Sequence, residues 1–76
     1  MPRFYFHQHL NGQVAEDRRG RQFANIKEAC EHVVHRIPAV LRKTIRTTRN
    51  TYLATEISDG KRTLAVVRAK VIIEKT

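Results

Sequence analysis

The residues with the most obvious chemical potential in this 76-residue chain are its single cysteine and its four histidines. Cys30 precedes His32 and His35 by two and five residues, so a nucleophilic thiolate activated by imidazole is conceivable. A helix turns by about 100° per residue, and on a helix the thiol would point away from both imidazoles. We therefore expect Cys30 to pack in the core as a small hydrophobic side chain, and we assign no catalytic residue.

The histidines form two pairs. His7 and His9 would share one face of a strand, and His32 and His35 one face of a helix. The helix is expected to cover the other face of that strand, which separates the pairs. Neither Cys-x-x-Cys nor His-Glu-x-x-His spacing occurs. We expect no metal ligands and no cofactor, and we interpret the imidazoles as exposed, with His32 and His35 each paired to a glutamate one helical turn earlier.

The strongest compositional signal is charge. Fifteen Lys and Arg residues against seven Asp and Glu give a formal charge of +8. A field of that sign attracts polyanions, such as nucleic acid or an acidic protein surface. Basic residues late in a helix also complement its dipole, and any solvated helix face carries charges. If nucleic acid is a partner, the expected phosphate contacts on the outer helix face are Arg36, Arg42, Lys43, Arg46 and Arg49.

The acidic residues suggest no catalytic pair. Glu16 and Asp17 are neighbours, but they lie on a predicted turn, and two adjacent acids on a turn do not form an acid–base pair. We therefore predict a protein that is not an enzyme, and no small-molecule substrate is evident from the sequence.

The first half of the predicted sheet is a hairpin. Residues 3–10 alternate between apolar and polar, with the phenylalanines on one face. Asn11-Gly12 predicts a turn into a second strand at 13–16. A two-residue loop would place Val14 on the polar face beside the histidines, whereas a three-residue loop with Gly12 in a bulge would place it on the phenylalanine face. Burial of the valine favours the three-residue loop.

A helix is predicted next. Asn25 and Glu28 have the spacing of a capping box, and apolar residues recur every three or four positions from Ile26 to Ile45. Pro38 lies inside this stretch and removes one backbone hydrogen bond. Because the apolar stripe stays in phase across the proline, we predict a single kinked helix, and the alternative is a break at the preceding isoleucine.

A second hairpin ends the chain. Residues 51–58 alternate, an Asp-Gly pair predicts a turn, and a long last strand covers 62–74. Alternation fails near Val66-Val67, so either a bulge switches the faces there or both faces are covered. The second alternative would indicate a subunit interface. The residues assigned to that interface are Tyr5, Tyr52, Val67, Val71 and Ile73.

Together these elements predict one α+β domain spanning residues 1–76. Its order is ββαββ, with two hairpins forming an antiparallel sheet and one helix packed on one face. The order of the strands in the sheet is left open.

Four short motifs occur in a characteristic order: a Met-Pro-Arg opening followed by aromatic residues (1–7), an Asp-x-x-Gly turn (17–20), a capped helix start (25–29) and the Asp-Gly pair (59–60). In this order the chain resembles a family of small uncharacterised bacterial proteins, a domain of unknown function. The resemblance spans nearly the whole chain. It implies the fold and supplies no activity.

Size and cysteine content complete the expectation. A lone cysteine cannot form an internal disulfide and fits a reducing compartment, and no apolar run is long enough for a signal or membrane segment. A core of this size is marginal, so a second subunit is expected. We predict a cytoplasmic, non-catalytic basic interaction module that is homo-oligomeric and has no membrane partner. The alternative is an accessory nucleic-acid-binding protein, and an acidic protein is a further candidate partner.

Overall fold

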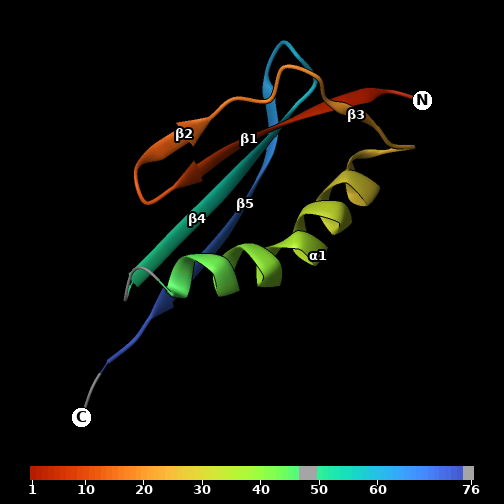
Figure 1. Ribbon diagram of the computed structural model, residues 1–76. Helices are drawn as coiled ribbons and strands as arrows, with labels where there is room; N and C mark the ends of the chain where they lie inside the picture. Colours follow the sequence, from red (N-terminus) through yellow and green to blue (C-terminus); the bar gives the residue numbers. More distant parts are fainter. Residues whose placement is uncertain (47–49, 75–76) are drawn as a thin grey trace.

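The computed structural model describes residues 1–46 and 50–74. It consists of an antiparallel sheet with a single helix on one face (Figure 1). The elements in chain order are β1 (Arg3–Leu10), β2 (Gln13–Ala15), β3 (Arg21–Gln22), α1 (Ile26–Ile45), β4 (Asn50–Ser58) and β5 (Thr63–Ile72). The predicted α+β class and ββαββ order are confirmed, and β3 is a short additional strand.

The strand order is β2-β1-β4-β5, with β3 also paired to β1. Each predicted hairpin forms, and the two hairpins join where β1 pairs with β4 at the centre of the sheet. On its other side, β1 pairs with β2 near its end and with β3 near its start. Strand β5 is therefore one edge of the sheet, and the segment from β2 to β3 follows the other edge.

The register of the first hairpin differs from the prediction. Val14 pairs with His9 across a two-residue loop, so this valine lies on the face away from the helix and is 58% exposed. The loop residues Asn11 and Gly12 both have positive φ, at 48° and 86°, as a type I′ turn requires. Asn11 also accepts a hydrogen bond through Oδ1 from the amide of Tyr52. The preference of the turn for this backbone conformation outweighs burial of one valine.

Helix α1 begins and continues as the sequence predicts. The amide of Glu28 donates to Oδ1 of Asn25 at 2.9 Å, and the Glu28 carboxylate accepts from the amide of Ala24 at 3.3 Å. The first bond satisfies an amide that the first helical turn leaves unpaired. The second joins the residue before the N-cap to the helix. The helix continues through Pro38 as one element, and its axis changes direction about midway along (Figure 1).

The core lies between α1 and the sheet, because the helix packs mainly on β4 and β5. The buried apolar side chains of the described residues are Phe4, Ala29, Val33, Leu53 and Ile57. Cys30 is half-buried and packs against this cluster, in agreement with its predicted apolar role. The apolar stripe of α1 therefore faces the phenylalanine side of β1, as expected.

A bulge does interrupt β5, but it lies earlier than expected. The pairing with β4 shifts between Ile57 and Ser58, which leaves Leu64 as the additional residue. The predicted position at Val66-Val67 is therefore wrong, and alternation is regular after the bulge. Ala65, Val67, Ala69 and Val71 face the helix side, and Val66, Arg68, Lys70 and Ile72 face the open side.

The turn before β3 yields a testable prediction. Gly20 has a φ of +66°, and a Cβ there would lie 2.7 Å from the carbonyl oxygen of Phe4, whereas a Cβ at Gly12, with φ +86°, would meet nothing within 4 Å. Left-handed backbone costs alanine about 1–2 kcal/mol at either site. Only Gly20→Ala must also displace the backbone of β1. We expect its melting temperature to fall about 4–8 °C or more below that of Gly12→Ala.

Thermal unfolding followed by circular dichroism measures both variants. Equal melting temperatures for the two alanine variants would contradict the close approach of Gly20 to β1.

Candidate functional site

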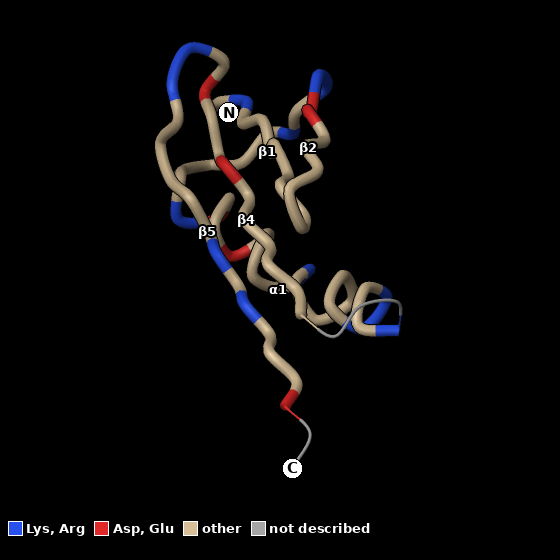
Figure 2. Tube along the Cα trace, turned by 90° about the vertical axis from the view of Figure 1, so that its left-hand side faces the viewer, with Lys and Arg blue, Asp and Glu red and all other residues tan. Residues whose placement is uncertain are grey.

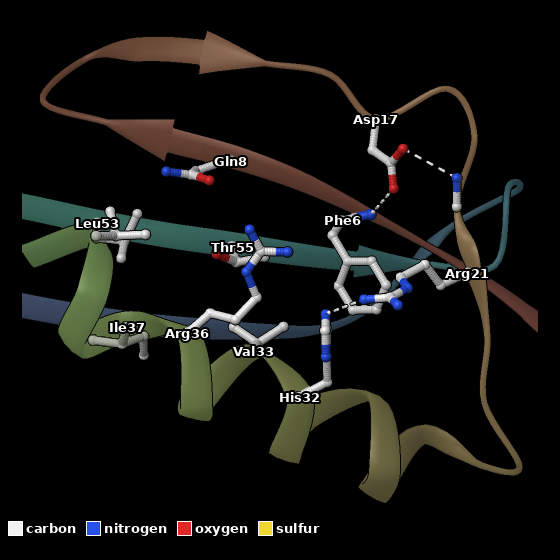
Figure 3. Close-up of a pocket in the computed structure, with 12 residues that line it drawn as sticks. Phe6, Gln8, Asp17, Arg21, His32, Val33, Arg36, Ile37, Leu53 and Thr55 are labelled. Atoms are coloured by element: carbon white, nitrogen blue, oxygen red, sulfur yellow. Dashed lines mark hydrogen bonds between the residues drawn. The ribbon is translucent and has the colours of Figure 1, made fainter.

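The helix side of the sheet is only partly covered. Helix α1 packs mainly on β4 and β5. A cavity of about 310 Å³ therefore remains between the helix, β1, β4 and the segment that joins β2 to β3 (Figure 3). One end of this groove is apolar, with Ile37, Val40 and Leu53 in its wall. The polar residues that line it are Gln8, Asp17, Arg21, His32, Arg36 and Thr55.

Asp17 ties the wall of the groove to β1. Its Oδ2 accepts a hydrogen bond from the amide of Phe6, and its Oδ1 accepts from the amides of Arg19 and Gly20, each at 3.0 Å. The amide of Asp17 in turn lies 3.2 Å from Nδ1 of His7. The carboxylate is therefore occupied by backbone donors, where β1 is paired with neither β2 nor β3.

The electrostatics of Asp17 follow from these bonds. Burial by itself would raise the pKa of the carboxyl group, but the amides of Gly20, Phe6 and Arg19 together outweigh it, and the pKa is lowered. Hydrogen bonds donated to a carboxylate favour its charged form. Asp17 is therefore ionised at neutral pH and serves as a structural acceptor.

His32 was expected to be exposed, and this is wrong. Its ring lies against Phe6 and Phe23, with centroids 5.7 and 5.1 Å away, and its Nε2 is 3.3 Å from Nη1 of Arg21. Burial lowers the pKa of His32, and the positive charges of Arg21 and Arg36 and the neighbouring His35 lower it further. The imidazole is therefore neutral at pH 7, in cation-rich surroundings. No ion pair between His32 or His35 and a glutamate is found among the described residues.

Arg36 lies apart from the other residues that the sequence predicts as phosphate contacts. It rises from α1 into the groove towards Thr55 and Gln8 (Figure 3). Arg42, Lys43 and Arg46 are exposed, as Arg36 is, but they lie outside the groove. Figure 2 shows basic residues gathered at the end of α1. The fifth predicted member, Arg49, lies outside the described residues.

Sequence reasoning did not find the groove. One signal was present: Arg36 follows the fully buried Ala29 by seven residues, which places it only about 20° away around the helix. Arg21 and His32 carried no such signal, because they meet only when β3 pairs with the start of β1.

The residues predicted to form an interface do not share one face. Tyr5 and Tyr52 lie on the open face of the sheet, opposite the helix. Val67 and Val71 lie on the helix side, and Val67 packs against the core. Ile73 follows the last residue of β5 and is exposed.

The open face carries a second, more open hollow. His9, Tyr52, Arg68 and Lys70 line it, and the Lys70 ammonium lies 5.2 Å from the centre of the Tyr52 ring. An aromatic ring with basic side chains beside it is a surface on which a nucleic-acid base can stack. Next to it, Nε2 of His9 lies 3.4 Å from a carboxylate oxygen of Glu56.

Within residues 1–46 and 50–74, no three His, Cys, Asp or Glu side chains come together in a way that could hold a metal ion. No helix in that part of the chain is both long and apolar enough to cross a bilayer.

Comparison with known families gives one match. Residues 3–70 match the model of the domain of unknown function DUF6894. The chain belongs to this family. The match runs from the start of β1 to Lys70 in β5, so it includes every residue that lines the groove. A search of curated proteins and a search of solved structures found no match.

The role of Asp17 gives a second prediction. Removing an acceptor that three backbone amides share should cost about 1–3 kcal/mol, so Asp17→Ala should melt several degrees lower than the parent. Because the folded pKa is lowered, this stabilisation is present above the unfolded value near 3.8 and is lost as the pH falls through the folded pKa. The difference in free energy of unfolding between the parent and Asp17→Ala should therefore narrow below about pH 4.

Glu16→Ala is the matched control, since Glu16 is the exposed acidic neighbour. Urea unfolding at several pH values measures the effect. Two results would contradict the structural role of Asp17. One is a difference in free energy of unfolding that stays constant down to pH 2, and the other is an equal loss of stability in Glu16→Ala.

Proposed function

We propose that this protein is a non-catalytic interaction module that works as a homodimer. The observation that carries the proposal is its surface. A compact monomer of 8.9 kDa should expose about 4,800 Å², whereas this chain exposes 5949 Å². The excess, about 1,100 Å², is comparable to the roughly 800 Å² that each partner buries in a stable interface.

The elongated shape and the small core also support a dimer. The radius of gyration is 13.4 Å, against about 11.4 Å for a compact chain of this length. Among the described residues only five apolar side chains are buried, and an interior that small supplies little stability by itself. A second copy would supply additional burial without a disulfide or a metal.

The edge strand β5 is the surface that best fits a second copy. It is ten residues long, contains no proline and has β4 on one side only. Natural proteins usually protect such an edge with a proline, a bulge or inward-pointing charges. After Leu64, β5 has no proline, no further bulge and no inward-pointing charge, and its protective charges are Arg68 and Lys70 on the open face. Antiparallel pairing of β5 with its own copy would give a symmetric interface and a continuous sheet.

Charge restricts how the two copies can pair. An antiparallel register centred on residues 68–70 would bring Arg68 and Lys70 opposite each other or opposite themselves, which is repulsive. A register centred on Val71 or Ile72 would bring Glu74 of one copy opposite Arg68 or Lys70 of the other. We therefore favour pairing through the second half of β5.

Nucleic-acid binding is the second candidate function, and the hollow on the open face favours it. Tyr52, Arg68 and Lys70 lie together there, the face is uncovered, and the chain carries a charge of +8. Edge pairing of β5 would leave this face free in both copies, so the two functions are compatible.

The dimer has a direct test. Light scattering at high protein concentration should give twice the mass of one chain. Glu74→Lys should weaken the dimer about tenfold, because two symmetric pairs become repulsive and each changes by up to about 1 kcal/mol. A second change should restore the dimer of Glu74→Lys. This change is Arg68→Glu if the register is centred on Val71, and Lys70→Glu if it is centred on Ile72.

Lys61→Glu, in the exposed turn at the far end of β5, is the control and should leave the mass unchanged. A strict monomer at high concentration would overturn the proposal, and a dimer indifferent to Glu74→Lys would overturn the pairing through β5.

Nucleic-acid binding is tested with a single-stranded oligonucleotide. Its affinity should fall linearly with salt on a log–log scale. Replacing both Arg68 and Lys70 with alanine should lower the affinity by about tenfold and make the salt slope shallower by roughly 0.7 for each phosphate that is no longer neutralised. Alanine at Arg42, Lys43 and Arg46 is the comparison, and it should have the smaller effect. Absence of binding, or binding that ignores salt, would exclude this function. Binding that survives both variants would exclude these two surfaces.

A further inference from the structure

The groove between α1 and β1 has two chemically different ends. Arg21, His32 and Arg36 form the polar end, and Ile37, Val40 and Leu53 form the apolar end. Figure 3 shows the Arg36 side chain directed into the hollow from the helix and Arg21 approaching His32 from the other wall. Two guanidinium groups thus approach one half-closed space from two different elements.

Neither guanidinium forms an ion pair with an acid within the described residues. The acid that lines the groove, Asp17, already accepts from three backbone amides. The ion pair found in the structure joins His9 and Glu56 on the opposite face of the sheet. Among residues 1–46 and 50–74, the polar partner found for the Arg21 guanidinium is His32. Burial together with Arg21, Arg36 and His35 lowers the pKa of that imidazole. With the ionised Asp17 counted, the charged residues that line the groove, Arg21, Arg36 and Asp17, carry a formal net charge of +1.

The ring cluster beneath the polar end of the groove holds it in place. Phe6 and Phe23 meet edge to face at 5.9 Å, and His32 packs against both. Since Phe23 directly follows β3 and His32 lies on α1, the cluster fixes the two walls relative to each other. A charged end that is held in place before a ligand arrives loses less entropy on binding.

We propose that this groove binds a small amphipathic anion, with its carboxylate or phosphate group between Arg21 and Arg36 and its apolar part along Ile37, Val40 and Leu53. The planar guanidinium group can donate two parallel hydrogen bonds to two oxygens of a carboxylate or a phosphate. A volume of about 310 Å³ is at the small end of the range for ligand pockets, which suits a short acyl or aryl chain. The site does not depend on the proposed dimer, because β5 lies at the opposite edge of the sheet from β2.

The test uses four probes on the full chain: hexanoate, hexyl phosphate, inorganic phosphate and hexan-1-ol. Amide and imidazole NMR shifts report binding. We expect saturable shifts at groove residues with the hexyl anions, and affinities weaker by roughly tenfold or more for inorganic phosphate and for the alcohol. If only one hexyl anion binds, the proposal holds and the preferred head group is identified.

Two further measurements separate this site from general attraction to a basic protein. Arg36→Gln should weaken binding of the preferred anion about tenfold or more, whereas Arg42→Gln, on the exposed end of the helix, should leave it unchanged. A bound anion should also raise the pKa of His32, because it offsets the charges of Arg21 and Arg36 and favours the protonated imidazole.

The proposal is overturned if neither hexyl anion binds, if hexan-1-ol binds as well as hexanoate, or if Arg36→Gln leaves the affinity unaltered. Heteronuclear NMR spectra of the free variants establish that each one is folded, so loss of binding is not confused with unfolding.

Discussion

The hydrogen bonds of Asp17 are the interaction on which the rest of the structure depends. β1 meets β2 at one end and β3 at the other, and the Asp17 carboxylate accepts from the amide of Phe6 between them. The same carboxylate closes the turn to Gly20, whose lack of a side chain lets the chain pass against the carbonyl of Phe4. This path positions β3, then Phe23, and then the start of the helix. An unpaired stretch of strand edge thus becomes the wall of a groove.

A helix that covers only part of one sheet face leaves three kinds of surface. The groove, the open face and the outer edge of β5 are each exposed for the same reason, which is that one helix of 20 residues cannot cover a sheet and also close its edges. Each surface has its own chemistry. The groove combines guanidinium groups with an apolar wall, the open face combines aromatic and basic side chains, and the edge presents unpaired backbone groups. Their separation would allow one small domain to serve more than one partner.

Much of the architecture could be predicted from local patterns. Alternation in residues 3–10 indicated β1, the spacing of Asn25 and Glu28 indicated the helix start, and the in-phase stripe correctly predicted one helix through Pro38. Two errors have different causes. The prediction for Val14 is wrong because it chose the hairpin register by burial of the valine. The conformation of the turn decides the register, since Asn11 and Gly12 adopt the positive φ that a two-residue loop needs. The predicted position of the bulge in β5 is wrong because that position depends on pairing with β4.

By itself the sequence determined which segments become helix or strand, except β3, together with the turns and the apolar face of the helix. These properties depend on dihedral preferences, side-chain periodicity and hydrogen bonds between residues close in the chain. Only the tertiary structure decided that Arg21 meets His32, that Arg36 enters a groove while Arg42 lies outside it, and that β5 is an edge strand. Those outcomes require segments far apart in sequence to pair in one register, and the register follows from backbone hydrogen bonds and packing across the sheet, which no local pattern encodes.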